Sequence, residues 1–362
     1  MKTLLIIIVS LLSIRLFAQS PEIIWAHNFG GTSLDDQGKI VRLLDTTYLI
    51  AGRSSSNDVD LTNNYGFTDI WVAKVDTNTN IIWQKNFGGS SSEFLGDLIS
   101  LSDGNYLIGG ASGSSDFDVT YNHGSIDIWL VKISPDGDIL WQLSIGGTDG
   151  EYVHSIIEAN DGNIYFTGES ASDDGDIGVH YGVDTWDAIY GKVSGSGVLQ
   201  WVKVVGTNNE DEGNQVIQLN YDNNFLIVGT TGYLGSNKYW IRKFDPDGNM
   251  IWDRYYGGSN YDNAESVYEL SGHNLIVTGQ SYSFDGNVTG HHGSDYADVW
   301  TIKLDKNGDF LQGLCFGGSL TDIGNQIAEG EDATSLLIVC ETTSQDDGDV
   351  SGIHSHDLTP DI

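Results

Sequence analysis

The stretch Ile81-Ile82-Trp83-Gln84-Lys85-Asn86-Phe87-Gly88-Gly89 recurs in variant form six times along this 362-residue chain. A tryptophan, replaced by Gln312 in the last copy, is followed four residues later by an aromatic or aliphatic residue and then by glycine. The copies are centred on positions 25, 83, 141, 201, 252 and 312, and their first glycines lie 58, 58, 60, 51 and 60 residues apart. A period of this length is typical of stacked or radially arranged supersecondary units.

Each repeat is expected to contain four β-strands. In the second copy, the tryptophan segment 81–87 is followed by apolar segments at 97–101 and 106–110, and then by Asp127-Ile128-Trp129, which opens a fourth segment ending at Lys132. Asp103-Gly104-Asn105 separates the second and third segments, and Asp-Gly between apolar runs is a strong hairpin signal. The extra length of the repeat lies mostly between the third and fourth strands.

Four strands in a repeating unit are typical of a β-propeller blade. The sequence therefore predicts an all-β propeller of about six four-stranded blades of roughly 58 residues, with an incomplete last blade. The fourth strand occurs only five times, because its sixth copy would start at Asp361-Ile362, where the sequence stops. One interpretation is a six-bladed ring that lacks one strand at a seam joining the two ends. A truncated chain is favoured instead, because folded sheets avoid open edges.

Residues 1–18 have the pattern of a secretory signal peptide, with Lys2, an apolar run and Ala18 at the expected cleavage point. The repeat domain then covers residues 19–362, and no later stretch is apolar enough to predict a membrane span. Without Lys2 and Arg15, 14 basic residues face 51 acidic ones, a net charge of about −37. Nucleic acid is therefore excluded as a partner.

Two cysteines, Cys315 and Cys340, fall in the last repeat. A disulfide between them fits an oxidising compartment. Two buried thiols are the favoured alternative, because the other repeats contain no cysteine.

Acidic clusters recur in the long loop between the third and fourth strands. Carboxylates spaced by one residue, with a nearby glycine, are typical of calcium loops, although Asp and Gly are also ordinary turn residues. The copies lack the complete ligand series of a known calcium loop, so a structural turn is the alternative. The candidate calcium ligands are Asp58, Asp60, Asp116, Asp118, Asp174, Asp176, Asp285, Asp347 and Asp349. No other cofactor is indicated.

The same loops carry aromatic residues that could stack on a sugar, with loop packing as the alternative. These candidate ligand-binding residues are Tyr65, Tyr121, Tyr181 and Tyr296. We expect a non-enzymatic scaffold for extracellular binding or adhesion, with a glycan or protein ligand. The alternative is a polysaccharide hydrolase or lyase whose site lies in the propeller channel, and its catalytic residues cannot be assigned from the sequence.

The repeat resembles a group of secreted Bacteroidetes proteins built from concatenated propeller-type units. The resemblance rests on Asp-x-Trp-x-x-Lys (Asp127 to Lys132), Asp-x-x-Gly-x-x-x-Trp (Asp245 to Trp252) and Phe-Gly-Gly (Phe87 to Gly89), and it covers residues from about 22 to 362. Proteins of this group are sometimes labelled lectin-like, and they are cargo of type IX secretion. The resemblance implies a location outside the cell, at the cell surface or in the periplasm of a Gram-negative bacterium.

Overall fold

The computed structural model describes residues 27–61, 63–183, 185–233, 236–293, 295–330, 335–345 and 347–350. The expected signal peptide at 1–18, the first tryptophan segment around Trp25 and the end of the chain at 361–362 lie outside these ranges. All 22 elements of the described residues are β-strands. Among those residues, no helix is long and apolar enough to cross a membrane.

The described strands form five four-stranded antiparallel sheets and one two-stranded sheet. The first sheet contains β1 (Asp35–Arg42), β2 (Tyr48–Ser54), β3 (Asp69–Val75) and β4 (Ile81–Phe87); the second contains β5 (Glu93–Ser100), β6 (Tyr106–Ser112), β7 (Asp127–Ile133) and β8 (Ile139–Ile145). The third contains β9 (Glu151–Glu158), β10 (Ile164–Ser170), β11 (Asp187–Val193) and β12 (Leu199–Val205). The fourth contains β13 (Glu212–Gln218), β14 (Phe225–Tyr233), β15 (Ser236–Phe244) and β16 (Met250–Tyr256). The fifth contains β17 (Asp262–Glu269), β18 (Leu275–Ser281), β19 (Asp298–Leu304) and β20 (Phe310–Phe316), and β21 (Asp322–Glu329) pairs with β22 (Leu336–Thr342).

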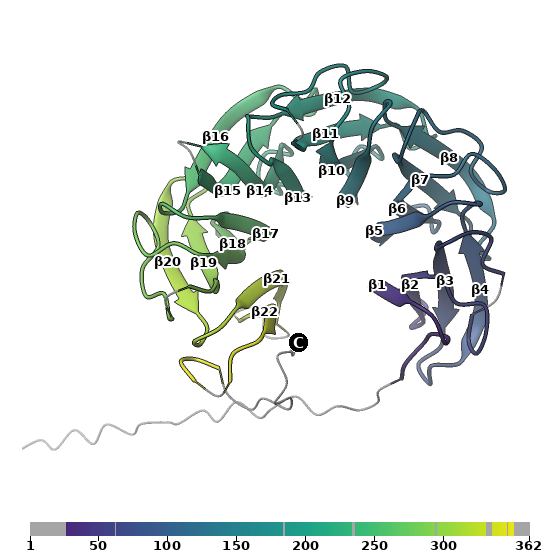
Figure 1. The fold of residues 1–362 in the computed structure, drawn as a ribbon, viewed down its shortest axis with the longest axis horizontal. Helices are drawn as coiled ribbons and strands as arrows, with labels where there is room; N and C mark the ends of the chain where they lie inside the picture. Colours follow the sequence, from purple (N-terminus) through teal and green to yellow (C-terminus); the bar gives the residue numbers. More distant parts are fainter. Residues whose placement is uncertain are drawn as a thin grey trace, which may run out of the picture.

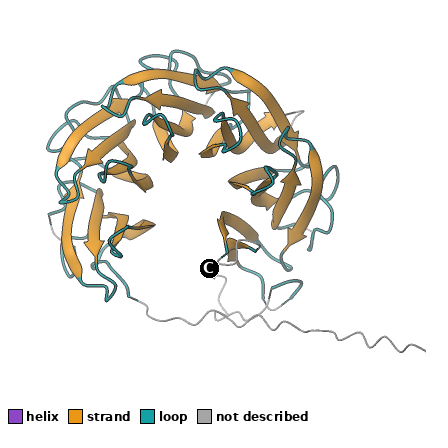
Figure 2. Cartoon of the chain, turned by 180° about the vertical axis from the view of Figure 1, so that it is seen from behind, coloured by secondary structure: helices purple, strands orange, loops and turns teal. Residues whose placement is uncertain are grey.

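The sheets are arranged around a common centre, with β1, β5, β9, β13, β17 and β21 innermost (Figures 1 and 2). The protein is therefore a β-propeller with five complete blades and a sixth sheet of two described strands, and the predicted fold class is confirmed. Each sheet starts one segment later than the sequence repeat, because the tryptophan segment is the outermost strand of the preceding blade. Trp83, for example, lies in β4 and pairs with Lys74 of β3.

The core lies between neighbouring blades. One cluster of buried side chains joins Val72 of the first blade to Leu98 and Ile108 of the second. The tryptophans of the third strands belong to this packing, since Trp129, Trp240 and Trp300 have no exposed surface. Burial of apolar surface between sheets thus holds the blades side by side.

The outer tryptophans also dock onto the next blade. Trp83 donates its indole N–H to the carbonyl oxygen of Pro135 at 2.9 Å, in the turn between β7 and β8. A Cβ atom on Gly137 would lie 3.1 Å from the Trp83 ring, and Gly137 has a φ of +80°. Glycine is needed there for both reasons, and the same packing against a tryptophan recurs at Gly197, Gly248 and Gly308.

The long loops between the second and third strands leave each blade at the same end as the Gly-Gly connections between blades. These loops span 55–68, 113–126, 171–186 and 282–297 in the first, second, third and fifth blades. In the fourth blade, β14 and β15 instead extend to Tyr233 and Ser236, so only residues 234–235 separate them. The fourth blade therefore has no long acidic loop at this position.

Candidate functional site

The first set of predicted calcium ligands holds the turns between blades. One carboxylate oxygen of each accepts the backbone N–H of the residue after the Gly-Gly pair, or after its equivalent. The distances are 2.9 Å from Thr32 to Asp58, 2.7 Å from Ser90 to Asp116, 2.8 Å from Thr148 to Asp174, 2.6 Å from Ser259 to Asp285 and 3.0 Å from Ser319 to Asp347. The hydrogen bonds from Thr32 lower the pKa of Asp58. These contacts account for the five aspartates as turn residues.

The second set lies beside the first glycine of each connection. Asp60, Asp118 and Asp176 each place Oδ2 3.4 Å from the backbone nitrogen of that glycine. Asp349 lies 3.7 Å from Nε2 of His292. The two aspartates of one loop thus contact different backbone groups and do not point toward one centre. Within the described ranges, no three His, Cys, Asp or Glu side chains are already grouped as a metal site. Calcium binding by these loops stays a prediction.

The four predicted ligand tyrosines are all partly exposed but lie in the loops of four different blades. Their exposed fractions are 41% for Tyr65, 59% for Tyr121, 45% for Tyr181 and 46% for Tyr296. Tyr65 stacks on Phe117, and Tyr121 makes an edge contact with His123. Neither of these ring contacts involves another of the four tyrosines. The structure does not bring them together as one aromatic platform.

An acid at or just before the start of each inner strand, half-buried in the first blade and buried in the others, is a group that the sequence analysis did not single out. Glu93 accepts a hydrogen bond from the backbone nitrogen of Gly89 at 2.9 Å and another from the Ser112 hydroxyl at 2.7 Å. Burial raises its pKa, and these hydrogen bonds oppose the rise. The equivalent acids are Asp35, Glu151, Asp211, Asp262 and Asp322, each with a serine or threonine hydroxyl as partner. Because the contacts repeat in every blade, this acid fixes the connection between blades.

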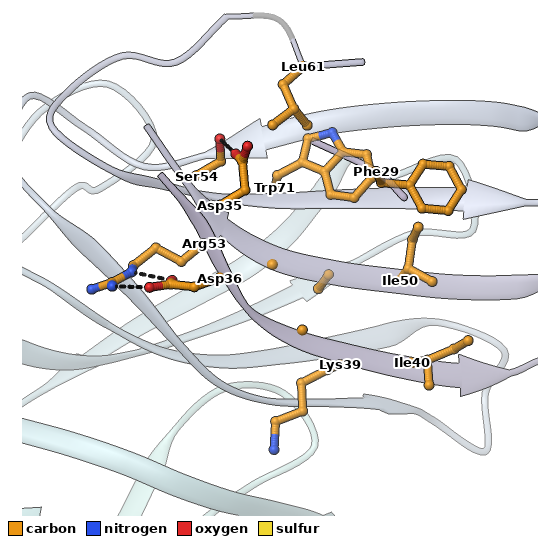
Figure 3. Close-up of a pocket in the computed structure, with 13 residues that line it drawn as sticks. Phe29, Asp35, Asp36, Lys39, Ile40, Ile50, Arg53, Ser54, Leu61 and Trp71 are labelled. Carbon is orange, nitrogen blue, oxygen red and sulfur yellow. Dashed lines mark hydrogen bonds and ion pairs between the residues drawn. The ribbon is translucent and has the colours of Figure 1, made fainter. Parts of the chain in front are cut away.

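A hollow on the first blade lies next to Phe29, Ile40, Ile50, Leu61 and Trp71 (Figure 3). It is an uncovered blade face. Ile40 is 61% exposed, whereas its equivalents Leu98, Ile156, Val216, Val267 and Ile327 are between 1% and 6% exposed. In the other blades the preceding sheet covers this position, and no described residue does so here. The apolar lining is therefore core surface and not a specific ligand site.

The inner edge of the ring carries the residues that change most from blade to blade. Immediately after the repeated acid, the inner strands have Asp36, Phe94, Tyr152, Glu212, Asn263 and Ile323. Their partners on the second strand also change: Arg53, Ala111, Glu169, Thr230, Gln280 and Glu341. On the inner strand the acid before this position repeats, and on the second strand a Ser or Thr repeats on one side of it. This pair of positions differs from blade to blade, and its side chains are half-buried in some blades and buried in others, such as Thr230 and Asn263.

Four half-buried side chains form a connected series across three blades, which we call the inner arc. Arg53, Phe94 and Tyr152 come from this pair of positions, and Trp186 comes from the loop before β11. The Arg53 guanidinium lies 5.0 Å above the Phe94 ring. The rings of Phe94 and Tyr152 are 5.5 Å apart, and those of Tyr152 and Trp186 are also 5.5 Å apart. Asp36 fixes Arg53 through two hydrogen bonds, at 2.8 and 2.5 Å.

Carboxyl groups border the inner arc on its third-blade side. Burial, together with the charges of Glu212 and Glu210, raises the pKa of Glu169 to about 8. Burial likewise raises the pKa of Glu265 to about 7, with Glu212 adding to the effect. His154 lies 3.8 Å from Glu169, and a hollow between the first three inner strands includes Phe94, Tyr152, His154 and Glu169. Buried acids with raised pKa values are typical of functional sites. Aligning the six repeats would have revealed this variability, although not the contacts.

The cysteines Cys315 and Cys340 are free thiols, with Cys315 buried and Cys340 partly buried. Burial raises the pKa of Cys315 to about 12, so the thiol stays protonated and unreactive near neutral pH.

No protein-family model matches the chain, and no curated protein matches it either. Among solved structures, it is similar to a protein of unknown function from Dyadobacter fermentans, with 12% identity, a TM-score of 0.49, and coverage of 87% of this chain and 92% of that one. It is also similar to the WD40 domain of Neurospora crassa Pan2, with 7% identity, a TM-score of 0.47 and coverage of 86% and 76%. An endo-1,5-alpha-L-arabinanase from Thermotoga petrophila has 12% identity, a TM-score of 0.35 and coverage of 86% and 75%. At these values the neighbours carry no functional argument.

Proposed function

We propose that the protein is a secreted, non-enzymatic β-propeller scaffold that binds a neutral glycan at the inner arc. The observation that carries this proposal is the connected series of Arg53, Phe94, Tyr152 and Trp186, built from positions that the repeat does not otherwise conserve. Half-buried aromatic rings offer flat apolar faces on which a sugar ring can stack.

Polar groups next to the rings supply the directional contacts that a sugar needs. Carboxylates such as Glu210 and Glu212 can accept hydrogen bonds from hydroxyl groups, and Arg53 can donate to them. A few placed polar groups in a mainly apolar lining are typical of small-molecule sites. The net charge of −35 repels an acidic polysaccharide and nucleic acid, so we favour an uncharged sugar chain.

A glycan array with purified protein tests this proposal, followed by calorimetric titration of the bound sugar. We expect Tyr152→Ala to weaken binding at least tenfold, because the ring is central to the inner arc. Tyr121→Ala is the matched control, since Tyr121 is 59% exposed in a loop outside the arc, and it should retain full affinity. Equal losses in the two variants, or full affinity in Tyr152→Ala, would contradict the proposal.

Glycoside hydrolysis at the same place is the second candidate, favoured by the raised pKa of Glu169 beside Glu212. A glycosidase needs one protonated carboxyl group as acid and a second carboxylate as base or nucleophile. Release of reducing ends from the array-identified glycan tests this activity. Glu169→Gln should abolish hydrolysis and leave binding intact if Glu169 is the acid, whereas no release by the wild-type protein excludes this candidate for that glycan.

A further inference from the structure

The aspartate that starts the third strand of four blades has one carboxylate oxygen without a hydrogen-bond partner. Asp69, Asp127, Asp187 and Asp298 have no exposed surface. In each, Oδ2 accepts a backbone N–H from the preceding loop, at 2.5 to 2.7 Å, and Oδ1 is buried without a partner. An unpaired buried carboxylate oxygen is costly, so its occurrence in four blades calls for a positive partner or a proton.

Around Gly88, this aspartate is joined by two more acids, which together we call the Gly88 cluster: Asp69, Glu93 and Asp118. A Cβ atom on Gly88 would overlap Oε2 of Glu93 and lie 2.5 Å from Oδ1 of Asp69. Asp118 places Oδ2 3.4 Å from the Gly88 nitrogen. Asp69 comes from the first blade and the other two from the second. None of the ion pairs among described residues involves these three side chains.

The equivalent position between the fourth and fifth blades contains a positive charge. Lys238 stands two residues before Trp240, as Asp69 stands two before Trp71, and Asn287 replaces Asp118. The Lys238 ammonium lies 3.9 Å from Oδ2 of Asp262, the equivalent of Glu93. Three carboxylates with a formal charge of −3 thus become one carboxylate, one ammonium and one amide, with a charge of 0. At this connection the ammonium group of Lys238 thus takes the place that the Asp69 carboxylate has in the Gly88 cluster.

Histidines occupy the other three described connections. His180 contacts Asp187 at 3.1 Å. His123 contacts Asp127 at 2.6 Å and Asp176 at 3.5 Å, and His292 contacts Asp298 at 2.9 Å and Asp349 at 3.7 Å. In the Gly88 cluster the equivalent residue is Tyr65, whose phenol cannot carry a positive charge. Its backbone nitrogen still donates to Asp69. The Gly88 cluster is therefore the all-carboxylate version of a site that elsewhere includes a basic side chain.

We propose that Asp69, Glu93 and Asp118 bind a calcium-type divalent cation that links the first two blades. All three ligands are carboxylates, and calcium prefers oxygen ligands in flexible geometry. Asp69 and Glu93 already face each other, whereas Asp118 must move toward them, which agrees with the lack of a ready-made three-residue metal group within the described residues. The competing partner is a proton, because burial and the neighbouring charge of Glu93 raise the pKa of Asp69 to about 7.

Calcium titration of chelator-treated full-length protein by calorimetry, with magnesium as comparison, distinguishes these partners. The decisive variant is Asp69→Lys with Asp118→Asn, which copies the arrangement found at Lys238 and Asn287. It should fold, bind one calcium ion fewer per chain than the wild type, and lose the shift of its melting temperature on adding calcium. Asp118→Asn alone should weaken the same site at least tenfold, and it tests the proposal if the double variant does not fold.

Asp116→Asn is the matched control, because Asp116 is an exposed acid in the same loop that contacts Ser90. It should keep the calcium stoichiometry and affinity of the wild type. Identical calcium binding by the wild type and the Asp69→Lys/Asp118→Asn variant would overturn the proposal, because the ions would then lie elsewhere. Failure of the wild type to bind calcium at millimolar concentration would also overturn it, leaving the shared proton as the partner of Asp69.

Discussion

Replacing one isoleucine in two blades measures how much the packing between blades stabilises the propeller. Ile156 and Ile40 occupy equivalent places on β9 and β1, but Ile156 is 1% exposed and Ile40 is 61% exposed. Truncating a buried isoleucine to alanine costs about 3 kcal/mol. The buried share of Ile40 is a little over a third, so Ile40→Ala should cost about 1 kcal/mol, and the two variants should differ by about 2 kcal/mol.

Urea unfolding followed by tryptophan fluorescence gives both values, provided that the slopes with denaturant agree with the wild type. The first blade would be expected to contribute less than an interior one because no described residue covers its face. If Ile40→Ala costs as much as Ile156→Ala, the face of the first blade is covered in solution and the reasoning from exposure is refuted. Equal small costs would instead show that packing between blades contributes little.

Two further predictions concern glycine and charge. Gly146→Ala should destabilise the protein by about 2 kcal/mol in the same unfolding assay, because a Cβ atom there would overlap Glu151 and lie 2.6 Å from Asp127. Gly38→Ala is the control: no atom lies within 4 Å of its Cβ, so it should change stability by less than about 1 kcal/mol. Equal effects of the two variants would argue against close packing at the connection between blades. The pKa of Glu169 is about 8 in the folded protein and near 4.5 in the unfolded chain. Between these pH values the native state holds a proton that the unfolded state has released, so the free energy of unfolding falls as pH rises. Chemical unfolding at several pH values should therefore show a shallower loss of stability from pH 5 to 8 in Glu169→Gln than in the wild type, and parallel curves would contradict the burial of this carboxyl group.

The fold could be predicted from the sequence because its determinants are local and repeated. Asp103-Gly104 marks a hairpin turn, the Trp83 segment marks an outer strand, and their fixed spacing defines the blade. The recurring tryptophan also packs between blades, as the contact of Trp83 with Pro135 shows. The sequence repeat begins at the tryptophan segment, but each sheet begins one strand later. This offset depends on which strands pair by hydrogen bonds, and the length of the repeat does not determine that pairing.

The candidate sites were harder to predict because they combine residues from different blades. Asp69 and Glu93 are 24 positions apart in the sequence, and only the packing of one sheet on the next brings them to either side of Gly88. The carboxylate spacing in the loops marked Asp118 and Asp116 alike as candidate calcium ligands, although Asp116 holds a turn and the role of Asp118 stays a prediction. The inner arc depends on ring contacts across three blades, which no local motif encodes.

Glycan binding by paired variants tests the central claim most directly, namely that recognition resides in the non-repeated inner edge and not in the loop tyrosines. One variant combines Phe94→Ala with Tyr152→Ala, and the other combines Tyr121→Ala with Tyr296→Ala. On a glycan array, with folding of each variant verified by its melting curve, we predict that the first loses the sugars bound by the wild type and that the second keeps them. Retention of binding by the first variant with loss in the second would contradict this account.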